Sequence, residues 1–130
     1  MMDLNNWSWI GDWTGRRAIL TPKREAIVDN ILKARYTFEM MNNRANQTAR
    51  LLLDFGVQKG DRVGVYSKNR FDFLDLLFGC GKIGAILTPF NVRLTTTEME
   101  YLIKKTDPSV FFYDPELATP FDELRSFLEK

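Results

Sequence analysis

The alternation of helical and strand-like segments after Thr37 limits the possible folds of this 130-residue chain more than any other feature. Parallel strands joined by helices need right-handed crossovers, which place the helices on the faces of the sheet. We therefore predict an α/β fold with a mainly parallel sheet and helices on both of its faces. Helical spacing of apolar residues marks 37–55, 70–83, 95–107 and 116–130, and short apolar runs mark strands at 62–67, 85–88 and 110–113.

Smaller elements precede and follow this alternating core. Trp9, Trp13 and Leu20 recur at near-helical spacing, which predicts an amphipathic helix. Pro115 to Pro120 is a linker-like stretch. The expected organisation is an N-terminal helix within 1–22, an antiparallel hairpin at 25–36, an α/β core at 37–114 and a terminal helix at 116–130.

Residues typical of helix ends mark the predicted boundaries. Thr95 and Glu98 fit a capping box, in which each side chain satisfies a free backbone N–H at the start of a helix. Glycine after a helix suits the left-handed backbone that closes it. The other predicted boundaries are N-caps at Thr37 and Asn69, closing glycines at Gly56 and Gly84, and Pro89 as the end of a strand.

Composition indicates a folded globular chain and excludes several classes of function. Hydrophobic residues make up 45% of the sequence and charged residues 27%, which is enough apolar material for a core. The net charge of +1 gives no strong field that would recruit nucleic acid or an anionic membrane. No apolar run approaches the roughly 18 residues that a membrane-spanning helix needs. We read no signal peptide and expect a cytoplasmic protein.

The cysteine and histidine content limits the chemistry. A single cysteine, Cys80, allows no intrachain disulfide, and the chain has no histidine. This excludes a Ser-His-Asp triad, a Cys-His dyad and a histidine-based metal site. Cys80 has no base or second cysteine nearby in sequence, so we expect it to be a small buried side chain. We assign no catalytic residue and no metal ligand within the 130 residues.

Three motifs lie in a fixed order between Tyr36 and Leu94. The first motif is Tyr36 to Met41 with Arg44-Ala45-Asn46, the second is Gly56 to Val63, and the third is Lys82 to Ala85 with Pro89 to Leu94. Their order and spacing are the basis of a resemblance to one enzyme family. Together they resemble the N-terminal region of adenylate-forming (AMP-binding) enzymes, and within that superfamily most resemble long-chain fatty acid–CoA ligases. The resemblance covers roughly Trp9 to Tyr113.

The resemblance implies a reaction, cofactors and a partner. Acyl-CoA synthetases join a carboxylate to AMP from ATP with Mg²⁺, release pyrophosphate and pass the acyl group to CoA. The chain would then be the incomplete N-terminal subdomain of the AMP-binding domain, and its partner would be the remainder of the parent enzyme. ATP, Mg²⁺ and CoA are implied for that parent, and no cofactor is assigned to these 130 residues.

The chain departs from the family pattern at one position and lacks the groups that carry the reaction. Met40 stands where the family has glutamate, which removes the reciprocal half of a capping box with Thr37. The Ser/Thr/Gly-rich loop with its lysine, which handles the ATP phosphates in this family, does not occur in the sequence. We therefore expect no ATP–pyrophosphate exchange from this chain alone.

Gly79 to Gly84 resembles a phosphate-binding loop only superficially. A Walker loop needs Gly-x4-Gly-Lys-Ser/Thr between a strand and a helix, whereas Ile83 follows Lys82 and the segment ends a helix. Gly79 and Gly81 each cost roughly 1 kcal/mol in helix propensity. Close approach by a neighbouring element would offset that cost, so we expect these glycines to serve packing.

Two groups of residues leave functional alternatives open. Trp7, Trp9 and Trp13 suit either an interfacial membrane anchor or docking against the parent enzyme, and the incomplete basic face favours docking. Arg93 follows a strand end, the edge at which open parallel sheets bind ligands, and is the candidate contact for a phosphate or CoA. The alternative for Asn91, Arg93 and Thr95 to Thr97 is an exposed loop and a helix cap, and Asp72, Asp75, Glu98 and Glu100 are expected to be solvated.

Two hypotheses of different class follow. The favoured one is the N-terminal structural portion of an acyl-CoA synthetase that acts on a fatty acid. The alternative is a stand-alone α/β binding module without catalysis. A sheet without its neighbours exposes strand edges and apolar faces, so we also expect the chain to self-associate as a dimer.

Overall fold

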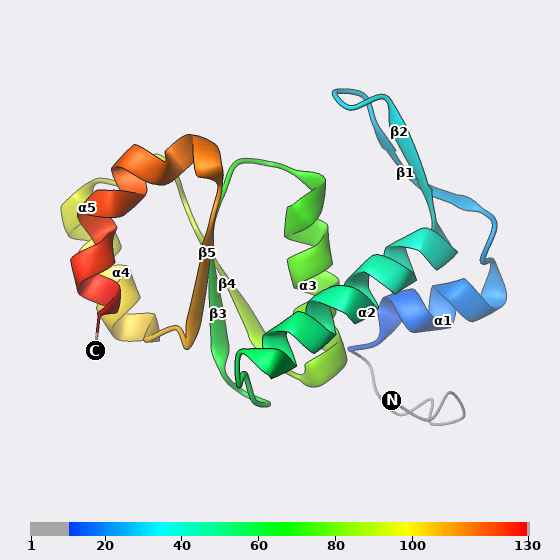
Figure 1. The fold of residues 1–130 in the computed structure, drawn as a ribbon, viewed down its shortest axis with the longest axis horizontal. Coiled ribbons are helices and arrows are strands. Elements are labelled where there is room, and N and C mark those ends of the chain that lie inside the picture. Colours follow the sequence, from blue (N-terminus) through cyan, green and yellow to red (C-terminus); the bar gives the residue numbers. More distant parts are fainter. Residues whose placement is uncertain (1–10, 130) are drawn as a thin grey trace.

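Residues 11–129, which the computed structural model describes, form a parallel sheet with helices on both faces and a separate two-stranded hairpin that projects from them (Figure 1). In the larger sheet β3 (Arg62–Tyr66) lies between β4 (Ile86–Phe90) and β5 (Val110–Tyr113), and both pairings are parallel. β1 (Glu25–Asp29) and β2 (Ala34–Thr37) form a separate antiparallel hairpin. The helices are α1 (Trp13–Leu20), α2 (Phe38–Asp54), α3 (Phe71–Ile83), α4 (Thr96–Thr106), the 3-10 helix η1 (Pro115–Leu117) and α5 (Ala118–Leu128).

Each face of the parallel sheet carries its own apolar core. α2 and α3 cover one face, and α4 and α5 cover the other (Figure 1). Successive β3 side chains alternate between the two cores, because side chains in a strand point to opposite faces. The predicted α/β class, with helices on both faces and a small hairpin, is confirmed. The cores are Leu52, Val57, Val63, Val65, Leu76 and Cys80 on one face, and Tyr66, Phe90, Met99, Ile103, Phe121 and Leu124 on the other.

Glycines in α3 allow its backbone to approach neighbouring elements. A Cβ atom on Gly79 would lie 2.8 Å from Cγ2 of Thr48 in α2, and one on Gly81 would lie 2.7 Å from the carbonyl oxygen of Gly11. Such distances leave no room for a side chain at either position. The expected close approach is therefore confirmed, and it explains why a buried helix keeps two residues of poor helix propensity.

Several predicted helix ends are confirmed by their hydrogen bonds. The Thr37 hydroxyl accepts from the backbone N–H of Met40 at 3.3 Å, and Thr95 and Glu98 form the complete capping box. Gly56 and Gly84 have φ angles of 81° and 75°, the left-handed conformation that suits glycine after a helix.

Three predicted boundaries were wrong for physical reasons. Arg70, not Asn69, is the residue before α3, and it makes no side-chain capping hydrogen bond. Pro89 lies inside β4, opposite Val65, because β4 is an edge strand that tolerates the missing N–H. The expected linker from Pro115 is ordered as η1 and the first turn of α5, where Pro120 removes no helical hydrogen bond.

α1 turns much of its predicted apolar stripe away from the chain's own core. The described part of this helix begins at Trp13, and Trp7 and Trp9 lie outside the described residues. Trp13 is 66% exposed and Leu20 54% exposed, whereas the short residues Thr14 and Gly15 are buried. Small side chains on the buried side therefore bring α1 close to the body of the molecule.

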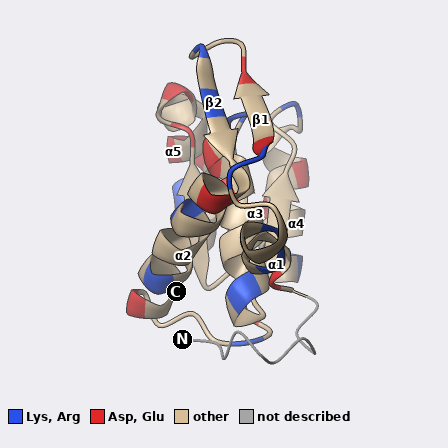
Figure 2. Cartoon of the chain, turned by 90° about the vertical axis from the view of Figure 1, so that its right-hand side faces the viewer, with Lys and Arg blue, Asp and Glu red and all other residues tan. Residues whose placement is uncertain are grey.

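Basic and acidic residues alternate along the helices and strands in the view of Figure 2. This distribution agrees with the net charge of +1. None of the helices formed by residues 11–129 combines the length and apolar composition required to cross a bilayer.

Replacing Gly79 by alanine tests the close packing of α2 and α3. Alanine in place of a helix-interior glycine normally raises stability by about 1 kcal/mol. Here we expect Gly79→Ala to lower the free energy of unfolding by about 1–3 kcal/mol, because the new methyl group would overlap Thr48. Urea denaturation measures the change, with Ser126→Ala on the exposed side of α5 as a control that should change little. An increase in stability on Gly79→Ala would contradict the packing described.

Candidate functional site

The candidate site is the edge at which the three parallel strands end. β3 continues into Ser67 to Arg70, β5 into Asp114 and β4 into Asn91 to Arg93. Because the strands are parallel, these segments share one edge of the sheet. Ligands of open parallel sheets bind outside this carboxyl edge. β3 is central, so the segment with Arg93 lies on one side of it and Asp114 on the other.

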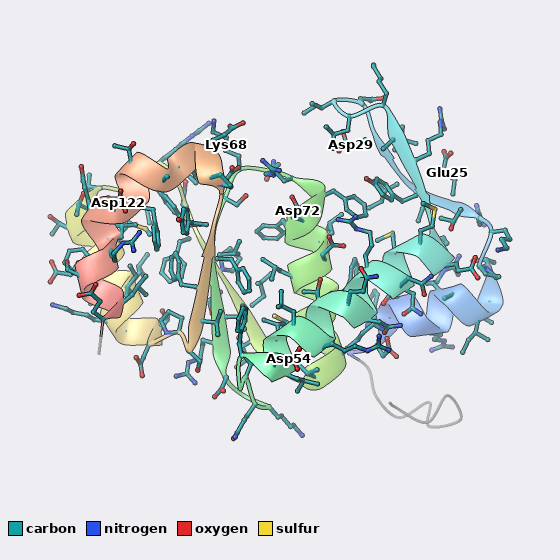
Figure 3. All side chains as sticks on the ribbon, in the orientation of Figure 1. Glu25, Asp29, Asp54, Lys68, Asp72 and Asp122 are labelled. Carbon is teal, nitrogen blue, oxygen red and sulfur yellow. The ribbon has the colours of Figure 1, made fainter. Side chains whose placement is uncertain are left out.

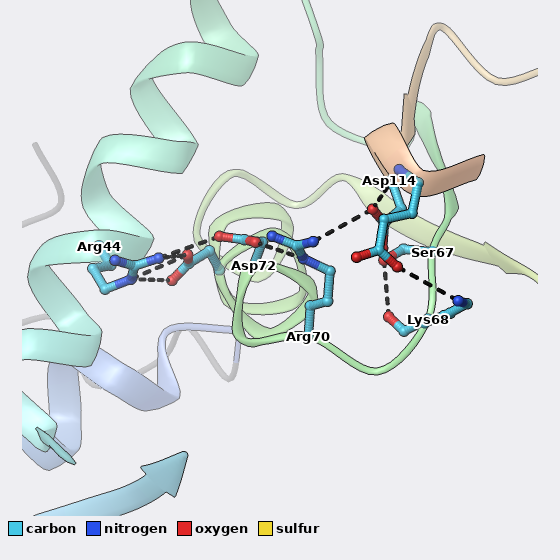
Figure 4. A network of polar contacts seen from close by, with 8 residues as sticks. Arg44, Ser67, Lys68, Arg70, Asp72 and Asp114 are labelled. Carbon is cyan, nitrogen blue, oxygen red and sulfur yellow. Dashed lines mark hydrogen bonds and ion pairs between the residues drawn. The ribbon is translucent and has the colours of Figure 1, made fainter. Parts of the chain in front are cut away.

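Asp114 is a buried carboxylate at this edge. Its side chain is 1% exposed, and its Oδ1 accepts from the backbone N–H of Glu116 at 3.1 Å and from Nη1 of Arg70 at 3.4 Å (Figure 4). Its own backbone N–H donates to the carbonyl of Tyr66 at 2.9 Å. These bonds start η1 and pin the end of β5 to the end of β3. A buried carboxylate with such partners organises the edge without being free to act on a ligand.

A chain of alternating charges extends from Asp114 to α2 (Figure 4). Arg70 Nε lies 3.2 Å from Oδ2 of Asp72, and Asp72 Oδ1 lies 3.5 Å from Nη2 of Arg44. Arg44 in turn binds Asp75 with two nitrogens, Nη2 at 2.5 Å and Nε at 3.0 Å. Figure 3 shows Asp72 on α3, between the hairpin side of the molecule and the sheet. The network therefore joins α2, α3 and the carboxyl edge.

The Arg44–Asp75 pair lies at the α2 end of this network and is partly enclosed. The Asp75 side chain is only 13% exposed, whereas that of Asp72 is 63% exposed. The expectation of a solvated carboxylate is therefore wrong for Asp75, which is committed to Arg44. The hydrogen bond to Asp75 is the main cause of the raised pKa of the Arg44 guanidinium.

Aromatic rings complete the surroundings of Arg44. The rings of Tyr36 and Phe71 stack with their centroids 4.0 Å apart. The guanidinium carbon of Arg44 lies 4.7 Å from the centroid of Phe71 and 5.6 Å from that of Tyr36. Such cation–π contacts add to the ion pair. Two residues of the first motif, Tyr36 and Arg44, thus brace the hairpin, α2 and α3 against one another.

Lys82 of the third motif makes a different set of internal contacts. It is 9% exposed, and its Nζ donates to Oδ1 of Asp12 at 2.5 Å and to Oδ1 of Asn42 at 2.7 Å. Asp12 also accepts from the N–H of Gly15 and caps α1. The ammonium group therefore joins α1, α2 and α3. Its segment closes a helix at Gly84, which has the left-handed conformation, and this favours the packing interpretation over a phosphate loop.

Arg93 lies apart from both internal networks. Its backbone N–H donates to Oδ1 of Asn91 at 3.0 Å, and its exposed guanidinium makes no hydrogen bond or ion pair with another residue of 11–129. The neighbouring hydroxyls serve structure: Thr95 caps α4, and Thr96 donates to Glu123 at 2.9 Å. Arg93 therefore stays a candidate contact for an anion, and Asn91, Thr95 and Thr96 hold local structure.

Cys80 is a packed core residue, as expected. It is 1% exposed, and burial raises the pKa of its thiol to about 11. The thiol is therefore protonated near neutral pH and is not a nucleophile.

The sequence interpretation missed Asp114 and Arg70 as partners. One signal was available: a polar residue directly after a strand belongs to the same edge as the residues that follow the other parallel strands.

Replacing Arg44 tests the network energetically. Arg44→Lys keeps the charge but loses the two-pronged contact with Asp75 and the planar contact with the aromatic rings. We expect a loss of about 1–3 kcal/mol in the free energy of unfolding, measured by urea denaturation. Arg125→Lys, in an exposed pair with Asp122, is the matched control and should cost at most roughly 0.5 kcal/mol. Equal stability of Arg44→Lys and wild type would show that the network is not a brace.

Comparison with known proteins places these features in a family. The family model described as AMP-binding enzyme matches residues 15–130. The long-chain-fatty-acid–CoA ligase FadD13 of Mycobacterium tuberculosis is 32% identical over 117 residues, which are 90% of this chain and 23% of that protein. The 2-succinylbenzoate–CoA ligase of a Geobacillus species is 34% identical over 109 residues, or 84% of this chain and 22% of that protein.

Solved structures agree with the sequence relatives. An inhibitor-bound crystal structure of the N-terminal domain of FACL13 from M. tuberculosis superposes with a TM-score of 0.84 at 32% identity, over 89% of this chain and 29% of that chain. The chain spans less than a quarter of the length of both curated relatives named above. The family match nevertheless covers nearly all of it, and the chain belongs to the AMP-binding enzyme family.

Proposed function

We propose that this chain is the N-terminal structural portion of an AMP-forming acid–CoA ligase. The observation that carries the proposal is the family match over residues 15–130. The geometry supports a structural part, because the motif side chains Tyr36, Arg44 and Lys82 all contact partners within the chain. Their contribution is to hold α2 and α3 against the sheet whose carboxyl edge faces the ligand side.

The proposed reaction has two steps, both carried by groups of the parent enzyme outside these 130 residues. A carboxylate oxygen attacks the α-phosphorus of ATP, the bond to pyrophosphate breaks, and an acyl-AMP forms. The CoA thiol, losing its proton, then attacks the acyl carbon and AMP leaves. Mg²⁺ and basic groups offset the negative charge that gathers at the phosphates. Arg93, exposed at the carboxyl edge, is the residue of this chain that we propose for contact with a phosphate of ATP or CoA.

A fatty acid is the proposed substrate, and the cytoplasm the proposed location. The proposed substrate rests on the resemblance of the motifs and on the 32% identity to a ligase named for long-chain fatty acids. A relative of similar identity is named for 2-succinylbenzoate, so the acid itself has to be measured. Chain-length selectivity is proposed to reside in the rest of the parent enzyme.

We propose that the remainder of the parent enzyme covers the apolar flank beside β5. Leu51 on α2 and Phe55 directly after it are 44% and 56% exposed, and Phe55 packs on Phe112 of this edge strand with ring centroids 6.3 Å apart. Open strand edges with apolar flanks favour association. In the chain by itself, a second copy would take the place of the parent and form a dimer, which light scattering would detect.

Carboxylate-dependent ATP–pyrophosphate exchange tests the proposal. Residues 1–130 alone should give no exchange, since the sequence has no Ser/Thr/Gly-rich loop followed by lysine. A polypeptide that joins these residues to the remainder of an AMP-binding domain should exchange with a long-chain fatty acid. Exchange by residues 1–130 alone, or no exchange by the longer polypeptide with acids from acetate to palmitate, would overturn the proposal.

A further inference from the structure

The β1–β2 hairpin carries two large aliphatic side chains at its tip. The hairpin stands away from the helices that surround the sheet (Figures 1 and 2). Ile31 is 87% exposed and Leu32 69% exposed, the two highest values among the exposed large hydrophobic residues described. Isolated exposed aliphatic residues are ordinary, but an adjacent pair at the end of a projecting element forms a convex apolar point.

The tip is held in this exposed arrangement by its own hydrogen bonds. Oδ1 of Asp29 accepts from the backbone N–H groups of both Ile31 and Leu32 at 2.9 Å. Lys33 completes the turn with a positive φ of 54°. Across the strands, Arg35 and Glu25 form an ion pair at 2.7 Å. The two aliphatic side chains are thus presented by a fixed turn and do not fold back onto the body.

One cation, Lys33, lies directly beside this apolar point, whereas Arg35 lies in β2 and Lys23 and Arg24 lie at the base of the hairpin, before β1. The segment 23–35 has four basic residues against two acidic ones, and both acidic side chains are already engaged, Glu25 with Arg35 and Asp29 with the turn. Lys23 pairs with Glu39. Arg24 and Lys33 form no ion pair with another residue of 11–129, and both are exposed. The net charge of +1 gives no long-range attraction, so any attraction to an anionic surface comes from these local charges.

The hairpin points to the same side of the molecule as the carboxyl edge of the sheet. In Figure 1 the tip and the segments that follow β3 lie along the upper side. In Figure 3, Asp29 near the tip and Lys68 after β3 are both on that side. A surface touched by the tip would therefore face the edge at which ligands of such sheets bind.

We propose that the hairpin tip inserts Ile31 and Leu32 into the surface of an anionic lipid bilayer. A convex point with two aliphatic side chains and an adjacent exposed cation, Lys33, matches the apolar–anionic boundary of such a bilayer. This inference rests on the proposed function for its purpose, because a long-chain fatty acid partitions into bilayers, and contact with the bilayer would bring the carboxyl edge close to the substrate.

Vesicle co-sedimentation of residues 1–130, without ATP or fatty acid, tests the contact. Wild type should sediment with phosphatidylcholine–phosphatidylglycerol vesicles and much less with phosphatidylcholine alone. Ile31→Ser with Leu32→Ser should lower the partition coefficient about 10-fold or more, because several buried CH₂ groups are lost. Lys33→Glu should lower it roughly 10-fold on the anionic vesicles, with little change on the neutral ones. Circular dichroism verifies that each variant is folded.

The chain offers a matched control for the aliphatic pair. Ile19 and Leu20 are also adjacent, 48% and 54% exposed, and lie at the end of α1. Ile19→Ser with Leu20→Ser should leave vesicle binding unchanged. The proposal is overturned if wild type does not bind anionic vesicles, if the tip variant binds as well as wild type, or if only the α1 variant loses binding. It is equally overturned if the tip variant changes the oligomeric state instead, which would make a second copy the occupant. Vesicle binding is measured without pyrophosphate exchange. A failure of the membrane proposal is therefore a separate result from a failure of the proposed function.

Discussion

The buried ammonium group of Lys82 is the contact on which the arrangement of the first three helices depends. Its partners come from segments far apart in sequence, Asp12 before α1 and Asn42 in α2. Removing a lysine charge from water is costly, and the cost is offset only when charged and polar partners surround it. The close approach of Gly81 to Gly11 brings the chain into position for these contacts. α1 is thereby fixed to the α/β core, although its large apolar residue Trp13 is mostly exposed and is not buried in that core.

The charged motif residues Arg44 and Lys82, and Asp114 after β5, are likewise satisfied by partners within the chain. Arg44 is bound by Asp75 and two aromatic rings, Asp114 by Arg70 and the turn, and Lys82 by Asp12 and Asn42. A charge already satisfied inside a protein is a poor candidate for substrate chemistry, because freeing it leaves its partner unpaired. In this chain Arg44, Lys82 and Asp114 therefore serve the framework. The ligand-facing candidates are exposed residues outside the networks, with Arg93 the clearest case.

Features determined locally could be predicted from the sequence, and features determined by distant segments could not. The capping box of Thr95 and Glu98 needs only its own four residues, and the order of helices and strands follows from periodicity. By contrast, α3 begins at Phe71, after Arg70, and this first residue stacks on Tyr36 of the distant hairpin, a contact that no local pattern contains. Pro89 is tolerated inside β4 because β4 is an edge strand, and the order of strands depends on pairing between distant segments. Strand topology could place Asp114 at the carboxyl edge, but its pairing with Arg70 joins residues 44 positions apart, and no local pattern reveals that contact.

Hydrogen–deuterium exchange of the Lys82→Met variant tests the central claim most directly. Methionine fills a similar volume without the charge, so the apolar packing of α3 is kept and the contacts to Asp12 and Asn42 are lost. If the ammonium group fixes α1, the backbone amides of α1 should exchange at least roughly 10-fold faster than in wild type, since a loss of about 1.4 kcal/mol or more corresponds to that factor. The amides of β3 should keep their protection. Unchanged protection of α1, or an equal loss in α1 and β3, would contradict the account.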